Sequence, residues 1–118
     1  VSHLNRGKVT IFGCGMGNPF FSTDTAAVLR GAEIGADVVL MAKNIDAIYT
    51  DDPRKNPDAK KLSEVDYDYI LKNHLSAIDT CAASFAMDNH MKLHIFGLDD
   101  SENIYRVIMG EKIGTIVD

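Results

Sequence analysis

A glycine-rich stretch near the N-terminus has the residue types that bind phosphate. It runs from Gly13 to Asp24 with the sequence GCGMGNPFFSTD and follows the apolar run Val9–Phe12. Glycines let a backbone bend sharply and let a ligand approach it closely. The helical pattern that leaves the stretch adds first-turn N–H groups, which lack a partner in the helix and favour an anion. The sequence therefore predicts nucleotide phosphate chemistry at this turn.

The end of this stretch combines hydroxyl groups with a carboxylate. Ser22 or Thr23 can cap the helix and still offer a hydroxyl group to a ligand. Asp24 suits the positive end of the helix dipole, but it repels a bare phosphate. A site that keeps both negative groups therefore needs a cation between them, either Mg²⁺ or a lysine from elsewhere. The competing interpretation is a tight turn without a ligand, since neither a P-loop nor a dinucleotide-binding spacing is present.

A second polar cluster, Asn44–Pro53, comes directly after an apolar run that is typical of a strand. Ligands of open α/β sheets bind outside the carboxyl ends of the strands. Tyr49 offers a flat face for a base, and Asn44 and Asp52 offer hydrogen bonds to a base or a ribose. A solvated loop with an Asp-Pro turn explains the cluster equally well.

Strand and helix patterns alternate along the chain. This order predicts an α/β fold in which a mainly parallel sheet has helices on both faces. All 118 residues fit one domain, because no linker or repeat divides them. We expect strands at Gly7–Gly13, Asp37–Ala42, Lys92–Leu98 and Gly114–Val117, and helices at Asp24–Ile34, Asp66–Asn73, Ile78–Asn89 and just after Ser101.

Two of these elements carry a burial prediction. Asp37–Ala42 is apolar on both faces, as is typical of a buried parallel strand. In the last helix, Ile104, Val107 and Ile108 form the stripe that we expect to face inward.

The composition is that of an ordinary globular protein, with 46% apolar and 25% charged residues. The net charge of −5 argues against non-specific binding to nucleic acid or to an anionic membrane. No apolar run approaches the roughly 20 residues that span a bilayer. Cys14 and Cys81 lie among apolar residues, which predicts buried free thiols and a cytoplasmic setting.

Three segments resemble the bacterial uridylate (UMP) kinases of the amino-acid-kinase superfamily. They are GMGNPFFSTD, RGAEIGADVVLMAKNIDAIYTDDPRKNPDAKKL and MGEKIGTIV. The resemblance matches the C-terminal half of such an enzyme, and so implies one half of a three-layer sandwich. It implies phosphoryl transfer from ATP to UMP, which gives ADP and UDP in pyrimidine nucleotide synthesis, with Mg²⁺ in the cytoplasm. It also implies a homo-oligomer, a hexamer, that responds to GTP and UTP.

The resemblance also assigns roles to residues of this chain. Asp24 lies at the reaction centre, where it orients a lysine or the metal environment. Asn44, Tyr49 and Asp52 bind ATP, with Lys43 as the alternative to Asn44. No residue is assigned as a protein ligand of a metal. The UMP-binding residues are Met16, Gly17, Asn18, Pro19, Phe20, Phe21, Ser22 and Thr23.

The chain departs from the family pattern in several ways. Met16 stands where the family usually has threonine, and Ala47 replaces a glycine, so the turn there must accept a Cβ atom. The family's N-terminal Lys-x-Ser-Gly motif, and the arginine and aspartate that complete its UMP site, do not occur in these residues. Because the chain starts at Val1 rather than methionine, we expect a piece of a longer protein.

Two expectations follow from these departures. On its own, the piece should be inactive and should expose a strand edge and an apolar face. The rival interpretation is a non-catalytic, regulatory nucleotide-binding module on the same half-fold, and the sequence upstream of Val1 would distinguish the two.

Overall fold

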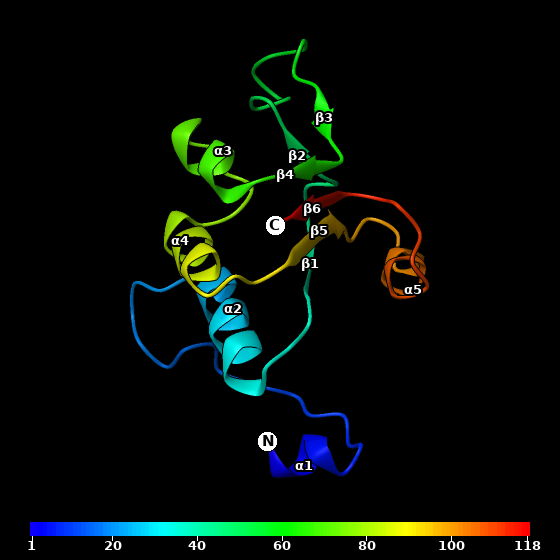
Figure 1. The fold of residues 1–118 in the computed structure, drawn as a ribbon. Coiled ribbons are helices and arrows are strands. Elements are labelled where there is room, and N and C mark those ends of the chain that lie inside the picture. The colour runs from blue at the N-terminus through cyan, green and yellow to red at the C-terminus, as the bar shows by residue number, and fades with distance from the viewer.

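The computed structural model describes residues 1–118, and Figure 1 shows its path from the N-terminus to the C-terminus. The helices are α1 (Ser2–Asn5), α2 (Thr23–Ile34), α3 (Tyr67–Lys72), α4 (Thr80–Asp88) and α5 (Glu102–Ile108). The strands are β1 (Val39–Lys43), β2 (Ile48–Tyr49), β3 (Lys61–Leu62), β4 (Glu64–Val65), β5 (Leu93–Gly97) and β6 (Thr115–Val117). No helix has both the length and the apolar character needed to cross a membrane.

The main sheet has four strands in the order β1-β5-β6-β4. β1 runs parallel to β5, with Val39 opposite Leu93 and Lys43 opposite Gly97. β6 is antiparallel to β5 and parallel to β4, so the expected mainly parallel sheet is confirmed. β2 and β3 form a separate antiparallel pair. We call this pair, with the loop that joins its strands, the β2–β3 hairpin.

Helices lie on both sides of the main sheet, as expected. In Figure 1, α2, α3 and α4 lie on one side of it and α5 on the other. The core lies on the first side, where Val28, Ala82 and Ile95 are completely buried. Gly31 lets α2 lie close to β1, because a Cβ atom at this position would lie 2.6 Å from the Cγ2 of Val39. This close packing fixes the position of α2 on the sheet.

Short-range contacts of polar residues and glycine define the helix ends. The Ser22 hydroxyl accepts a hydrogen bond of 3.3 Å from the Thr25 amide, so Ser22 caps α2. Gly35 ends the same helix in the left-handed conformation, with φ at 66°. Asp66 caps α3 by accepting a bond of 2.6 Å from the Tyr69 amide. Because these contacts are local, the sequence predicted the ends of α2 and the start of α3 within a residue.

The strand expected at Gly7–Gly13 is wrong. The segment is irregular, and Val9 and Ile11 are 95% and 93% exposed. A strand is stable only when its backbone groups pair with a neighbour, however β-forming its side chains are. No strand pairs with this segment. β1 pairs only with β5 and therefore forms an edge of the main sheet.

The predicted burial of β1 and α5 is only half right. Met41 of β1 is buried, whereas Leu40 and Ala42 on the opposite face are exposed. In α5 only Val107 is buried, and Ile104 and Ile108 are 41% and 65% exposed. Burial requires a packing partner on each face, and α2 covers only one face of β1.

The two cysteines also correct a prediction. Cys14 lies in the glycine-rich loop and Cys81 in the first turn of α4, and both are exposed free thiols rather than buried ones. Their apolar neighbours in the sequence pack elsewhere or are themselves exposed, because neighbours along a loop or a helix end do not share one face.

Candidate functional site

The site is built on the first turn of α2, which follows the glycine-rich loop. Asp24 lies in this turn, where the positive end of the helix dipole favours a carboxylate. The side chain of Asp24 is only 18% exposed. A carboxylate at such a position needs partners, and the structure provides two.

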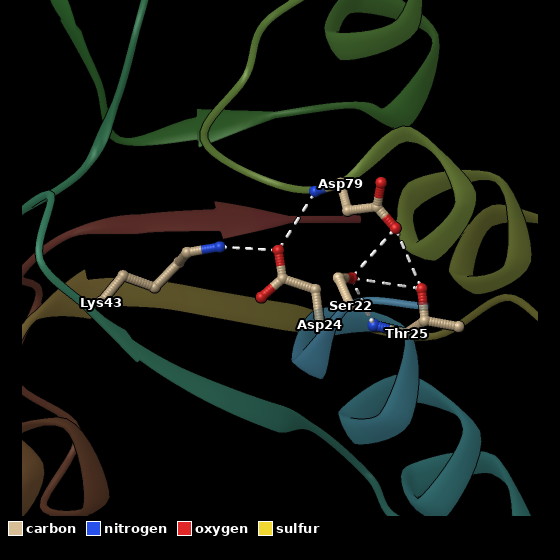
Figure 2. A network of polar contacts seen from close by, with 5 residues as sticks. All are labelled: Ser22, Asp24, Thr25, Lys43 and Asp79. Carbon is tan, nitrogen blue, oxygen red and sulfur yellow. Dashed lines mark hydrogen bonds and ion pairs between the residues drawn. The ribbon is translucent and has the colours of Figure 1, made fainter. Parts of the chain in front are cut away.

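The first partner of Asp24 is Lys43, the last residue of β1. Its Nζ lies 2.7 Å from Oδ2 of Asp24, and its side chain is 19% exposed (Figure 2). The Asp24–Lys43 pair joins the helix that follows the glycine-rich loop to the carboxyl end of a parallel strand. A lysine of this chain, one of the two kinds of cation expected at this site, therefore lies beside Asp24.

The second partner is the backbone of Asp79, a residue that the sequence analysis missed. Its amide donates a bond of 3.1 Å to Oδ2 of Asp24. Its own carboxylate accepts bonds of 2.9 Å from the Thr25 hydroxyl and 3.1 Å from the Ser22 hydroxyl. Figure 2 shows how these bonds tie the start of α2 to the start of α4.

The charge of Asp79 is stabilised by this arrangement. Partial burial acts to raise the pKa of Asp79, but hydrogen bonds to its carboxylate, first among them those from Thr25 and Ser22, together outweigh it and lower that pKa. An ionised Asp79 accepts from both hydroxyl groups at once and so orients Ser22, one of the residues expected to bind UMP. The only sequence signal for Asp79 was its place at the start of the helix expected at Ile78–Asn89, where a simple cap explains it equally well.

A cavity of about 480 Å³ opens beside Lys43. Its lining includes the three residues expected to bind ATP, namely Asn44, Tyr49 and Asp52, and also Lys43. The structure therefore gathers these candidates in one place, although Asn44 lies before β2, Tyr49 within it and Asp52 in the loop that follows. Asn44 and Lys43, the two alternatives for one ATP contact, both line the cavity. Of the two, only Lys43 also bonds to Asp24.

Tyr49 is held in place by Asp46, which precedes β2, and by Lys61 of the β2–β3 hairpin. Its hydroxyl donates a bond of 2.9 Å to Asp46, and Nζ of Lys61 lies 2.6 Å from the other oxygen of that carboxylate. The same Nζ lies 6.0 Å from the centre of the Tyr49 ring. The bond from Lys61 lowers the pKa of Asp46, and the bond to Asp46 raises the pKa of Tyr49. The phenol thus stays protonated and its ring stays fixed.

The turn at Ala47 accepts its Cβ atom, as the departure from the family pattern required. Ala47 is completely buried, and its φ angle is not positive. Replacement of the family's glycine therefore imposes no left-handed backbone here.

The glycine-rich loop is open to solvent. Phe20 is fully exposed and Phe21 is 50% exposed, and no side chain from Met16 to Phe21 makes a hydrogen bond. Of the eight residues expected to bind UMP, the structure brings only Ser22 into the Asp24 network. The loop amides are unpaired as well, because no backbone N–H from Gly15 to Thr23 donates a hydrogen bond within the chain. An open turn with unpaired amides can accept an anion.

The side chains do not form a metal cage of their own. No group of three or more His, Cys, Asp or Glu side chains is placed to hold a metal ion. Of the two carboxylates in the network, Asp24 already pairs with a lysine and Asp79 with two hydroxyl groups.

Comparison with known proteins gives a consistent result. UMP kinase from Bacillus anthracis has a TM-score of 0.92 at 33% identity, over 99% of this chain and 48% of that chain. UMP kinase from Ureaplasma parvum gives 0.90 at 32% identity, over 99% of this chain and 50% of that one. Uridylate kinase from Archaeoglobus fulgidus has a TM-score of 0.73 at 28% identity, over 86% of this chain and 49% of that chain.

The chain thus resembles UMP kinases in sequence and in fold, and it spans about half the length of these solved structures. The model of the amino acid kinase family matches residues 2–97 of this chain. The match covers most of the chain, including the glycine-rich loop, Asp24 and Lys43. The chain belongs to the amino acid kinase family.

Proposed function

We propose that this chain is the nucleotide-binding part of a UMP kinase, which transfers a phosphoryl group from ATP to UMP and gives ADP and UDP. The observation that carries the proposal is the Asp24–Lys43 pair. Asp24 directly follows the open glycine-rich loop, and Lys43 lines the cavity with the expected ATP contacts. The pair therefore stands where an acceptor on the loop and a donor in the cavity would meet.

The loop suits the acceptor, UMP. Its unpaired amides from Gly15 to Thr23 can donate to a phosphate, and the Ser22 hydroxyl lies at the same turn. The exposed rings of Phe20 and Phe21 are free to contact a base or a ribose. Met16, in the same loop, is half-buried.

The cavity suits the donor, ATP. Its volume of about 480 Å³ lies in the range of sites for small molecules and cofactors. The fixed ring of Tyr49 can stack on a base, and Asn44 and Asp52 can bond to the base or the ribose. Lys43 lies at the side of the cavity that faces Asp24, which is where the phosphates would point.

Phosphoryl transfer depends mainly on positioning and on neutralising charge. In this chain Lys43 supplies the positive charge beside the transferred group, and Asp24 holds the ammonium group in place. When bound with ATP, Mg²⁺ neutralises further phosphate charge, and it needs only one or two carboxylates besides the phosphates. A complete cage of protein ligands is therefore not required here.

The activity of a whole enzyme belongs to the full-length gene product, and nucleotide binding belongs to the chain described here. A coupled assay of the full-length product should detect ADP release that requires both ATP and UMP. Asp24→Asn should abolish most of this release without unfolding the protein. Binding of both nucleotides with no UMP-dependent release would instead favour the regulatory module, and folded protein that binds neither nucleotide would overturn the proposal.

The remaining properties implied by the resemblance stay predictions. They are assembly into a hexamer, control by GTP and UTP, and a place in pyrimidine nucleotide synthesis. We also propose a cytoplasmic location, since two exposed free thiols are typical of a reducing compartment.

A further inference from the structure

One wall of the cavity is built by an element with little stability of its own. Ile48 and Tyr49 of β2 line the cavity, as do Asp51 and Asp52 in the loop of the β2–β3 hairpin. β2 and β3 have two residues each and pair only with one another. A two-stranded ribbon of this kind is marginal in water, so the rest of the fold must hold it in place.

The hydroxyl of Thr115 connects the hairpin to the rest of the fold. Thr115 is the first residue of β6 and is completely buried. Its Oγ1 accepts a bond of 2.8 Å from the Ile48 amide in β2 and donates to the Leu62 carbonyl in β3. A hydroxyl has one donor and can also accept, and here each function is used on a different strand of the hairpin.

Thr115 is itself fixed by the main sheet. It lies opposite Ile95 of β5 in the antiparallel register. The preceding residue, Gly114, has a φ of 73°, and a Cβ atom there would lie 2.0 Å from the Ile95 carbonyl oxygen. This close approach is possible because Gly114 has no side chain, and the antiparallel pairing with β5 holds β6 in place. The two bonds from Thr115 therefore tie the hairpin to the rigid part of the molecule.

The position of this hydroxyl calls for a reason beyond filling space. Valine has nearly the same shape and buries no polar atom, so an apolar side chain would serve packing alone. The amide of Ile48 is followed directly by Tyr49, whose ring lines the cavity. A shift of β2 at Ile48 is thus transmitted to the Tyr49 ring through one peptide unit.

We propose that Thr115 is a positioning residue for the nucleotide cavity. It does not line the cavity, and it acts by fixing both strands of the hairpin that carries Tyr49 and Asp52. The inference rests on the proposed binding of ATP in this cavity. Asp24 and Lys43 lie on α2 and β1, outside the hairpin, so Thr115 controls the ATP side and leaves the UMP loop unchanged.

Calorimetric titrations of the full chain with ADP and with UMP test the proposal. Thr115→Val keeps the shape and loses both bonds, so ADP binding should weaken about tenfold while UMP binding stays at the wild-type value. Thr115→Ser keeps the hydroxyl and should restore ADP binding. An unchanged affinity of Thr115→Val for ADP overturns the proposal. An equal loss of affinity for ADP and for UMP would indicate a general structural role and would also overturn the proposal.

Hydrogen exchange separates this inference from the proposed function. The Ile48 amide should exchange faster in Thr115→Val than in the wild type, and Thr115→Ser should return it to the wild-type rate. If the wild-type chain binds no ADP, the proposed function fails, and exchange at Ile48 alone decides whether Thr115 holds the hairpin. If the Ile48 amide exchanges at the same rate in all three proteins, Thr115 does not fix the hairpin.

Discussion

Asp24 and Lys43 lie 2.7 Å apart although 19 positions separate them in the chain. The helix α2 runs from one partner toward the far end of the sheet, and β1 returns to the other partner. The helix–strand unit therefore closes on its own two ends. Both ends face the place where we expect phosphate groups, so the charge of Asp24 is balanced by a residue of the same unit.

Replacement of Lys43 tests the role of this pair. Lys43→Met leaves Asp24 without its countercharge beside the phosphates, so we expect ATP affinity to fall about tenfold. Lys43→Arg keeps the positive charge and should retain most of the affinity. Lys72→Met makes the same change of net charge on α3, where the side chain forms no ion pair, and should have little effect. Equal affinities for Lys43→Met and the wild type, measured by calorimetry, would remove Lys43 from the site.

Loss of the Asp79 carboxylate should loosen α2 from α4. Asp79→Ala leaves the hydroxyl groups of Ser22 and Thr25 without their acceptor, so we expect the free energy of unfolding to fall by about 2 kcal/mol. Asp88→Ala removes the same charge from an exposed position on α4 and serves as the control. Urea denaturation measures both. If the two variants unfold at the same urea concentration, the bonds from Ser22 and Thr25 to Asp79 do not stabilise the fold.

Alkaline pH should destabilise the fold through Tyr67. Burial, and secondarily the charge of Asp118, raises the pKa of Tyr67 to about 12 from 10.0. The folded chain thus holds this proton more tightly than the unfolded chain. The resulting stability is fully present below pH 10 and is lost as the pH rises to about 12.

Urea denaturation across this pH range measures the effect. Tyr67→Phe also loses the bond of 2.6 Å to the Met91 carbonyl, so at neutral pH it should be less stable by about 1 kcal/mol. Its stability should then decline less above pH 10 than that of the wild type. Tyr69→Phe, an exposed position on the same helix, should behave like the wild type. A parallel decline in wild type and Tyr67→Phe would assign the alkaline loss to other groups.

The unpaired edge of β1 should make the isolated chain self-associate. Its outer backbone groups lack a neighbouring strand, and Leu40 and Val38 expose apolar surface beside them. Leu40→Lys places a charge on this edge and should shift the chain toward monomer in sedimentation experiments. Ile108→Lys adds the same charge on α5 and should not. A wild-type chain that is already monodisperse as a monomer would refute the expectation.

Local signals explain the part of the fold that the sequence predicted. The cap at Ser22, the left-handed stop at Gly35 and the cap at Asp66 each act within a few residues. β5 was also predictable, because its apolar run is buried on both faces. The strand expected around Ile11 failed because strand formation depends on a partner that no local pattern reveals. β2 and β3 were missed because two-residue strands have no periodicity to detect.

The candidate site was predictable to a similar extent. Asp24 stood out because it follows the glycine-rich loop at a helix start. Lys43 entered only as an alternative ATP contact, and its bond to Asp24 depends on how β1 packs against α2. Asp79 and Thr115 lie 55 and 91 positions after Asp24, and their roles arise only when the chain is folded.

The glycine at position 31 has a consequence for the ion pair at the other end of its helix. A methyl group there would press on Val39 and lift this end of α2 away from the strand that ends at Lys43. Because a helix is stiff, the tilt would reach Asp24 roughly 10 Å away, two turns toward the N-terminus. Gly31→Ala should therefore separate the two charges without altering either one. The spacing of Asp24 and Lys43 is set by a residue that has no side chain and touches neither of them.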